Sequence, residues 1–374
     1  MKIFRSTTTT PIASNSLNGS HFRRTTLPAW AISLLLTTIS FSQAATIITF
    51  DAPGAVLTFV AGINPAGVIT GGYIDANNVE HTYLRAPDGT FTTYDAPGAG
   101  TGPGQGTGPN GINPAGATTG TVTDSSNATH GYVRAPDGAI TTFDAPGSTL
   151  TVPLGINPAG MIAGYYPDAS FVFHGFVRYA NGTMTIFDAP GAGTDPGEGT
   201  FMSIPFPINP MGTITGYYLD ASFVAHGFVR HPDGTITTFD VPGAGSGPFQ
   251  GTVGSGISPA GVIAGSYVDS NNVIHGIVRD ANGTITTFDV PAAGTLPGQG
   301  TQPLSINAPG AIAGVYVDAN NVLHGFARAV NDTITTFDPP GSVFTIAGSI
   351  NPMGTITGIY LDASGVSHGF LRTP

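Results

Sequence analysis

The chain has 374 residues, of which 40% are hydrophobic and 9% are charged, and it contains no cysteine. Disulfide bonds and thiolate metal sites are therefore excluded. The formal net charge is −11, and all the acidic residues lie beyond residue 44, where only seven basic residues accompany them. Because so acidic a chain repels phosphate backbones, we exclude nucleic acid as a partner.

The N-terminal 44 residues have the pattern of a secretory signal peptide. Residues 1–26 are polar and basic, residues 27–41 are apolar and uncharged, and Ser42-Gln43-Ala44 has the form of a cleavage site. A transmembrane anchor is the alternative, but the apolar run is shorter than the roughly 20 residues that a helical span needs. We therefore expect a signal peptide over 1–44, no membrane span in the mature chain, and secretion to the periplasm or exterior of a bacterium.

Residues 45–374 are built from one repeat with a period of 44–52 residues. In each repeat a hairpin Asp is followed six residues later by His, four after that by Arg, and ten after that by the Asp of a Phe-Asp or Tyr-Asp pair. The hairpin Asp residues are Asp75, Asp124, Asp168, Asp220, Asp269, Asp318 and Asp362. The His residues are His81, His130, His174, His226, His275, His324 and His368. The Arg residues are Arg85, Arg134, Arg178, Arg230, Arg279, Arg328 and Arg372. The closing Asp residues are Asp95, Asp144, Asp188, Asp240, Asp289 and Asp338.

The closing pair of the seventh repeat stands at the other end of the mature chain. Phe50-Asp51, in the segment 46–51, precedes the first repeat and has no repeat of its own, whereas the last repeat stops at Pro374 before its closing pair. A split repeat of this kind predicts a closed ring in which the N-terminal strand completes the last unit. An open solenoid has no use for such a segment, because its ends never meet.

Each repeat contains four strand-like segments rich in Ile, Val, Thr, Phe and Tyr. They are separated by turns of the types Asn-Pro-x-Gly, Asp-Ala-Asn-Asn or Asp-Ala-Ser-Phe, and Pro-Asp-Gly or Ala-Asn-Gly. Four short antiparallel strands per repeat are typical of a propeller blade. We predict an all-β fold: a single seven-bladed β-propeller domain over 45–374, with repeats ending near 95, 144, 188, 240, 289 and 338 and the last formed by the end of the chain at 374 plus 46–51.

The repeats differ in length at one place. From a closing Asp to the next hairpin Asp there are 24 to 32 residues, and the extra ones fall in a Gly/Pro-rich loop after the closing strand, such as 96–106. In a propeller these loops all lie on one face. Insertions on one face of a repeat protein are typical of the ligand-binding side.

The repeats resemble the HAF-type extracellular repeat. The resemblance rests on Ile-Asn-x-x-Gly-x-Ile-x-Gly followed by His-Gly-Phe, as at His174-Gly175-Phe176 and His324-Gly325-Phe326. Gly stands in this chain where that repeat has Ala, and the Phe-Asp-Ala-Pro-Gly segments are an addition. The resemblance implies an extracellular protein of unassigned activity, and it supplies no catalytic residues.

The recurring His, Arg and Asp residues have two interpretations. They could form a ring of metal or proton-relay sites. We favour structural braces in which His and Arg bond to the hairpin or closing Asp, because a fold repeated seven times needs identical braces whereas a function needs one site. The Asn of the Asn-Pro-x-Gly turn could likewise line a channel, but we expect it to bond its own turn. This position is occupied by Asn64, Asn113, Asn157, Asn209, Ser258 and Asn351.

Residues that break the repeat are the candidate ligand-binding residues. The longest loop holds two acids, Asp195 and Glu198, followed by Phe201 and Phe206. An acid pair beside aromatic rings could bind a sugar or a cation, or act as general acid and base. The next two long loops contribute Phe249, Gln250 and Gln299 to the same face.

We interpret the protein as a secreted binding module for a carbohydrate or for an envelope or extracellular protein. An extracellular glycan hydrolase or lyase using Asp195 and Glu198 is an alternative, and a structural matrix protein without a small ligand is another. We assign no catalytic residue, no metal ligand and no cofactor, and we expect a monomer.

Overall fold

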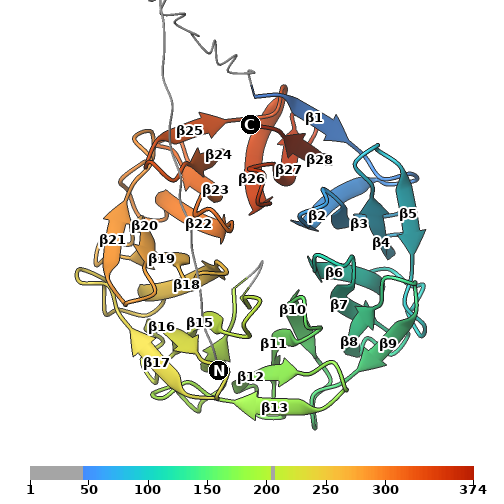
Figure 1. Ribbon diagram of the computed structural model, residues 1–374, viewed down its shortest axis with the longest axis horizontal. Helices are drawn as coiled ribbons and strands as arrows, with labels where there is room; N and C mark the ends of the chain where they lie inside the picture. The colour runs from blue at the N-terminus through green and yellow to red at the C-terminus, as the bar shows by residue number, and fades with distance from the viewer. Residues whose placement is uncertain (1–44, 204–206) are drawn as a thin grey trace, which may run out of the picture. The chain divides into compact units, whose positions relative to one another are not determined.

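The described residues, 45–203 and 207–374, form strands and turns and contain no helix (Figure 1). This computed structural model confirms the all-β prediction. Within the described part, no helix long and apolar enough to cross a membrane is found. The predicted signal peptide, residues 1–44, lies outside the described residues, as does Phe206.

The described strands fall into three sheets. A four-stranded sheet has the order β1-β28-β27-β26 and consists of β1 (Ile47–Phe50), β28 (Ser367–Arg372), β27 (Ile356–Asp362) and β26 (Ser342–Ile350). An eight-stranded sheet contains β2 (Leu57–Ile63), β3 (Ile69–Ile74), β4 (Glu80–Arg85), β5 (Phe91–Tyr94), β6 (Gly106–Ile112), β7 (Thr118–Thr123), β8 (Thr129–Arg134) and β9 (Ile140–Phe143).

The third sheet has sixteen strands along the chain. These are β10 (Val152–Ile156), β11 (Ile162–Pro167), β12 (Phe173–Arg178), β13 (Met184–Phe187), β14 (Gly199–Phe201), β15 (Ile214–Leu219), β16 (Ala225–Arg230), β17 (Ile236–Phe239), β18 (Gly251–Ile257), β19 (Ile263–Val268), β20 (Ile274–Arg279), β21 (Ile285–Phe288), β22 (Gly300–Ile306), β23 (Ile312–Val317), β24 (Leu323–Arg328) and β25 (Ile334–Phe337).

Each consecutive run of four strands is antiparallel, as in β2–β5, and we call such a run a unit. In the strand ladder, successive units of the larger sheets share a single parallel bridge, such as Glu80 with Gly106. Gly106 is required there because its φ is 125° and a methyl group at its Cα would overlap the Glu80 carbonyl. The units are therefore separate sheets held by contact with their neighbours rather than by a continuous ladder.

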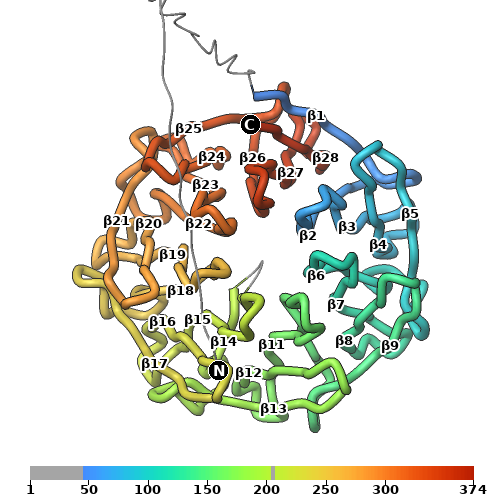
Figure 2. The backbone as a smooth tube through the Cα atoms, in the orientation of Figure 1, coloured from blue at the N-terminus to red at the C-terminus, as the bar shows by residue number. Residues whose placement is uncertain are grey.

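The predicted pairing of the two ends of the mature chain is confirmed. β1 pairs antiparallel with β28, with Ile47 opposite Arg372 and Phe50 opposite Gly369. Figure 2 follows the chain from the blue β1 to the dark red β28 beside it. β1 is therefore the fourth strand of the unit that β26, β27 and β28 begin.

The turns of the repeat fix where each strand ends. In the first complete repeat, Asn64 Oδ1 accepts a hydrogen bond of 2.9 Å from the amide four residues ahead, and Gly67 supplies a φ of 81°. Asp75 Oδ1 accepts bonds of 2.9 and 2.8 Å from the amides two and four residues ahead, and Asn78 supplies a φ of 61°. Where the chain reverses, these side chains supply the hydrogen bonds to backbone amides that the strand ladder no longer provides.

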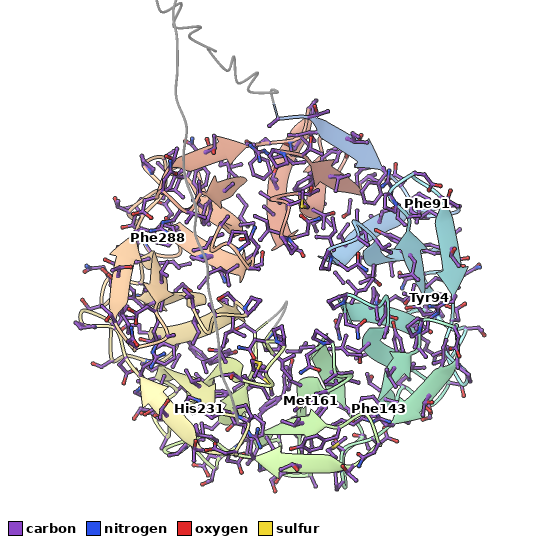
Figure 3. All side chains as sticks on the ribbon, in the orientation of Figure 1. Phe91, Tyr94, Phe143, Met161, His231 and Phe288 are labelled. Atoms are coloured by element: carbon purple, nitrogen blue, oxygen red, sulfur yellow. The ribbon has the colours of Figure 1, made fainter. Side chains whose placement is uncertain are left out.

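The units pack through one large buried side chain apiece and through an arginine. The side chain two residues after each His is fully buried in every repeat: it is Ile277 in the fifth repeat and a ring in the other six, Tyr83, Tyr132, Phe176, Phe228, Phe326 and Phe370. Each repeat's Arg then lies over the aromatic ring on the fourth strand of the preceding unit, at 4.7 to 5.0 Å from the ring centre. Figure 3 labels three of these rings, Tyr94, Phe143 and Phe288.

The interpretation that these Arg residues pair with the hairpin or closing Asp is wrong. In the described residues only Arg328 makes an ion pair, with Asp332 at 2.7 Å, and Asp332 belongs to neither class. A guanidinium is planar and weakly hydrated, so it stacks on a ring at a packed boundary more readily than an ammonium would. Six of the seven Arg therefore join neighbouring units without an acid.

The turns divide between two edges of the units. We call loop face the edge that carries the hairpins of the Asp75 type and the long loops, because these bond to each other: Gly104 N donates to Asn78 O (2.7 Å) and Glu80 N to Gln105 O (2.8 Å). We call turn face the opposite edge, where the Asn-Pro-x-Gly turn contacts the Pro-Asp-Gly turn at Gly67 and Pro87. The predicted gathering of the long loops at one edge is thus observed.

Candidate ligand-binding face

Each repeat His is held between two carboxylates on the loop face. Its Nδ1 lies 2.7 to 3.0 Å from the closing Asp, and its Nε2 lies 3.4 to 3.8 Å from the hairpin Asp of the same unit. In the last unit the closing carboxylate comes from Asp51, which bonds His368 at 2.8 Å across the two ends of the chain. In six units a Tyr of the second strand also lies against the His ring, as Tyr218 does with His226 at 4.9 Å.

In the second unit this arrangement shifts the pKa values of His130 and of its hairpin carboxylate, Asp124. Hydrogen bonds from the Ser126 hydroxyl and nearby amides lower the pKa of Asp124 to about 2. Burial alone would lower the pKa of His130, but hydrogen bonds and charge from Asp144 and Asp124 outweigh it and raise the pKa above 6.5. The result is a local clamp that joins the hairpin, the third strand and the closing strand of a unit.

The brace interpretation accounts for both ring nitrogens of each His. One carboxylate is bonded to Nδ1 and another lies near Nε2, so both ring nitrogens of each His face a carboxylate of the same unit. Across residues 45–203 and 207–374, no group of three or more His, Asp or Glu side chains is placed to hold a metal ion. The contacts of each His are those of a brace between the hairpin and the closing strand.

At five of these turns the Asn makes a second bond that the sequence did not reveal. Its Oδ1 bonds its own turn, as expected, but its Nδ2 donates to the carbonyl of the equivalent residue in the next unit, at 3.0 to 3.4 Å. The donors are Asn64, Asn113, Asn157, Asn209 and Asn307. Asn307 was missed because its turn reads Asn-Ala-Pro-Gly, so a search for Asn-Pro passes over it.

These turns surround a pocket of about 150 Å³. One Ile from each of the seven repeats lines it, together with Pro and Asn residues: Ile63, Ile112, Ile156, Ile208, Ile257, Ile306 and Ile350. The Asn side chains themselves are almost fully buried, Asn157 being 2% exposed. These five amide bonds form what we call the Asn belt, which runs around much of the pocket, and the lining of the pocket is mainly apolar.

The predicted Gln residues close the long loops. Gln250 Oε1 accepts a bond of 2.9 Å from the Gly247 amide, and its Nε2 donates to Asn272 Oδ1 in the next hairpin at 3.0 Å. Gln299 makes the same pair of bonds and is 1% exposed. Gln105, which was not singled out, occupies the same position in the first long loop. These amides are bonded within the protein and are not presented to a ligand.

Glu198 stands in the position of these Gln residues. Its Oε2 accepts a bond of 2.9 Å from the Asp195 amide, and the residue is 2% exposed. Asp195 itself is exposed at the tip of the same turn. Because the Glu198 carboxylate is turned into its own loop, the two acids do not face a common open space between them. The geometry gives the hydrolase interpretation no support at this pair.

Phe201 and Phe249 have different surroundings. Phe201 is half-buried between units, stacked on Tyr217 at 5.3 Å and close to Phe173 at 4.4 Å. Phe249 is 69% exposed and lies 5.7 Å from Phe223. Of the predicted residues in the described part, Phe249 and Asp195 are therefore the two exposed on the loop face.

Sequence reasoning missed two exposed or half-exposed rings on this face, Phe171 and Phe223. They occupy the fourth position of the Asp-Ala-Ser-Phe hairpins, where four other repeats have Asn and one has Gly. We interpreted these segments as ordinary turns. One pattern in the sequence could have indicated them: at a position where the backbone needs a positive φ, most repeats have a turn-forming Asn and these two have a large ring.

No protein-family model matches the chain, and no curated protein matches it. Among solved structures, the β-propeller domain of Cps50 (Swd1) from Myceliophteria thermophila matches with a TM-score of 0.52 and 9% identity, covering 88% of this chain and 100% of that domain. The fold is a β-propeller.

Two structures of puromycin hydrolase, one of them a mutant complexed with PGG, match with TM-scores of 0.51 and 0.50 and identities of 13% and 11%. They cover 83% and 85% of this chain but only 52% and 55% of the hydrolase, so this chain spans about half of its length. At such low identity the similarity shows the fold alone. The resemblance to HAF-type repeats stays a prediction.

Proposed function

We propose that this protein is an exported, seven-bladed β-propeller of the HAF-repeat kind that binds carbohydrate through its loop face. The single observation that carries the binding function is a division among the residues. The His, hairpin Asp and closing Asp side chains lie against one another in every repeat, whereas the exposed aromatic rings that break the repeat, Phe171 and Phe249, lie on the loop face. Exposed rings on the long-loop side of a repeat protein are typical of recognition.

Three features support seven blades and closure. The central pocket is lined by one Ile from each of the seven repeats, and β1 supplies the fourth strand of the last unit. Across the boundary between the last and first units, Ile63 N donates to Ser349 Oγ at 3.2 Å and Ser367 Oγ to Thr58 O at 2.7 Å. The N-terminal pattern over 1–44 supports export.

Glycan binding can be tested directly. The mature protein, residues 45–374, is fluorescently labelled and applied to a printed array of neutral and acidic oligosaccharides. We expect saturable binding to a subset of neutral glycans. Binding to no glycan, together with capture of a defined extracellular protein, would replace carbohydrate by a protein partner.

Export is tested separately. The full chain is expressed in a bacterial host, and the protein recovered from the periplasm and medium is sequenced from its N-terminus. We expect it to begin at Ala45. A product that keeps residues 27–41 and stays in the membrane fraction would show an anchor instead of a signal peptide.

A further inference from the structure

Three phenylalanines on the loop face break the repeat, and we call them the aromatic platform: Phe171, Phe223 and Phe249. Phe171 is 64% exposed and Phe249 is 69% exposed, while Phe223 is half-buried between them. All three are absent from the equivalent positions of the other repeats. Exposed rings in a protein with few charged residues need a reason other than solubility.

All three have a left-handed backbone. Their φ values are 62°, 59° and 62°. The equivalent hairpin residues have positive φ as well, and they are Asn78, Asn127, Asn272, Asn321 and Gly365. The residues equivalent to Phe249 are Gly104, Gly197 and Gly298. A bulky residue in this conformation is strained, and strained residues gather at ligand sites.

Backbone contacts join the three rings into one surface. Gly197 N donates to Phe171 O at 2.8 Å, which places the Asp195 loop against the first hairpin. On its other side, a methyl group at Gly197 would lie 3.4 Å from the Phe223 ring. Phe249 N donates to Phe223 O at 2.7 Å, and the two rings are 5.7 Å apart. The platform therefore runs across two adjacent units with the Asp195 loop in its middle.

A pocket lies at one end of the platform. It has a volume of about 230 Å³ and is lined by Phe171, Leu150, Pro167 and Asp168, together with Gly147, Thr149 and Ala169. Pockets for drug-sized ligands run from about 300 to 1,000 Å³, so this one suits a single small ring. The Asp168 side chain at its edge is 41% exposed.

The chemistry around the rings selects the ligand class. The acceptors beside them are the carboxylates of Asp168, Asp195 and, 31% exposed, Asp220. Acceptors of this kind bond to hydroxyl groups and repel anions. The faces of the rings carry partial negative charge and attract polarised C–H groups. Flat aromatic surface next to hydroxyl acceptors matches an uncharged pyranose, which has a C–H face and a rim of hydroxyls.

We propose that the aromatic platform binds a neutral glycan by stacking its pyranose rings on Phe171, Phe223 and Phe249, with the terminal sugar in the pocket beside Phe171. This proposal rests on the proposed carbohydrate function and assigns its site. Asp195 and Asp168 accept hydrogen bonds from the sugar hydroxyls. Glu198 positions the Asp195 turn and does not touch the ligand.

The test uses the residues that the other repeats already carry. Phe171→Asn, Phe223→Asn and Phe249→Gly are made singly and together in the mature protein, and Leu296→Ala serves as the control. Leu296 is 61% exposed in a long loop of another unit and lies outside the platform. Because each platform substitution restores a residue suited to a positive φ, the variants are expected to fold, and their melting curves are recorded as a check.

Binding is measured first on the oligosaccharide array and then by calorimetric titration of the best neutral oligosaccharide. We expect each single variant to weaken binding about tenfold and the triple variant to abolish it, while Leu296→Ala binds normally. Wild-type binding that the folded triple variant retains would overturn the platform and leave the carbohydrate function standing. If the wild-type protein binds no glycan, both the aromatic platform and the carbohydrate function are overturned. If it binds only acidic glycans and the triple variant binds them too, the platform alone is overturned.

Discussion

The loop face contains two kinds of region that are built on the same strands. The His–Asp braces recur with nearly constant geometry, since the Nδ1 distance varies only from 2.7 to 3.0 Å across the repeats. The aromatic platform occurs once and places three phenylalanines at backbone angles that favour Asn or Gly. A residue kept in every unit serves the fold, whereas a residue that costs stability in one place needs a separate explanation, for which we propose ligand binding.

Among changes to the recurring braces, we expect the largest loss of stability where the N-terminal strand pairs with the C-terminal strand. A chain that starts at residue 52 lacks β1, the Asp51 brace of His368 and the Phe50 ring beneath Arg85. We expect it to lose at least about 4 kcal/mol of unfolding free energy, which corresponds to a fall of about 6 °C in melting temperature. Differential scanning calorimetry measures this.

The matched control is a chain that starts at residue 45, which keeps β1 and removes only the predicted signal peptide. The control should melt like the processed protein. Equal melting temperatures for the chains starting at 45 and at 52 would show that β1 contributes nothing to closure.

The spacing of the sequence markers predicted the strands, the braces and this junction because each is a local pattern repeated many times. His226 and Asp240 are on adjacent strands of one unit, so their contact follows from the hairpin. Arg230 was assigned wrongly because its partner, Phe187, lies in the preceding unit and no local spacing connects them.

The candidate site was harder to predict for two physical reasons. Glu198 and Gln299 look like exposed loop residues, yet their side chains turn inward to bond their own loop. Phe171 was passed over because a single sequence does not display φ. Comparison of each turn position across all the repeats would have shown both features.

The braces also predict how stability depends on pH. The folded pKa of Asp124 is lowered to about 2 and those of Asp168 and Asp362 are lowered from 3.8, chiefly through hydrogen bonds to the carboxylates. These groups stabilise the fold above about pH 4, and that stability is lost as pH falls toward 2. The pKa values of His130 and His368 are raised above 6.5, so their contribution is complete below pH 6.5 and is lost as pH rises through the folded value.

Melting temperature recorded from pH 2 to pH 9 should therefore be highest between about pH 4 and 6 and fall by several degrees on either side. Replacing His130 and His368 by Gln should flatten the neutral side and leave the acid side unchanged. A profile whose neutral side is unaltered in that double variant would show that these braces do not titrate as described.

For the aromatic platform, unlike the braces, we expect that removing a side chain increases stability. Phe171→Asn should raise the free energy of unfolding by about 1 kcal/mol, because Asn adopts a positive φ with little strain. The reverse substitution at a platform-free unit, Asn78→Phe, should lower it by a similar amount. Urea unfolding of the two variants measures both. If Phe171→Asn is destabilising, the Phe171 ring contributes to folding, and its strained backbone angle is then explained without a ligand.

We expect the smallest effect on stability at Ser258, the one position of the Asn belt that does not hold Asn. Ser258 accepts a bond from the Val262 amide at 3.1 Å, as Asn does elsewhere, but it has no amide group to donate to the carbonyl of Asn307. Ser258→Asn supplies that donor at a site whose equivalents already hold Asn, and should add about 1 kcal/mol, or about 2 °C in melting temperature. Asn209→Ser is the matched loss, since it removes the 3.4 Å bond to Ser258 O and leaves a Ser that can still bond its own turn. Opposite shifts of similar size in the melting temperatures of the two variants would show that the amide belt, and not the turn itself, links the units around the central pocket. A lower melting temperature in both variants would show instead that Ser258 is required by the packing of its own unit.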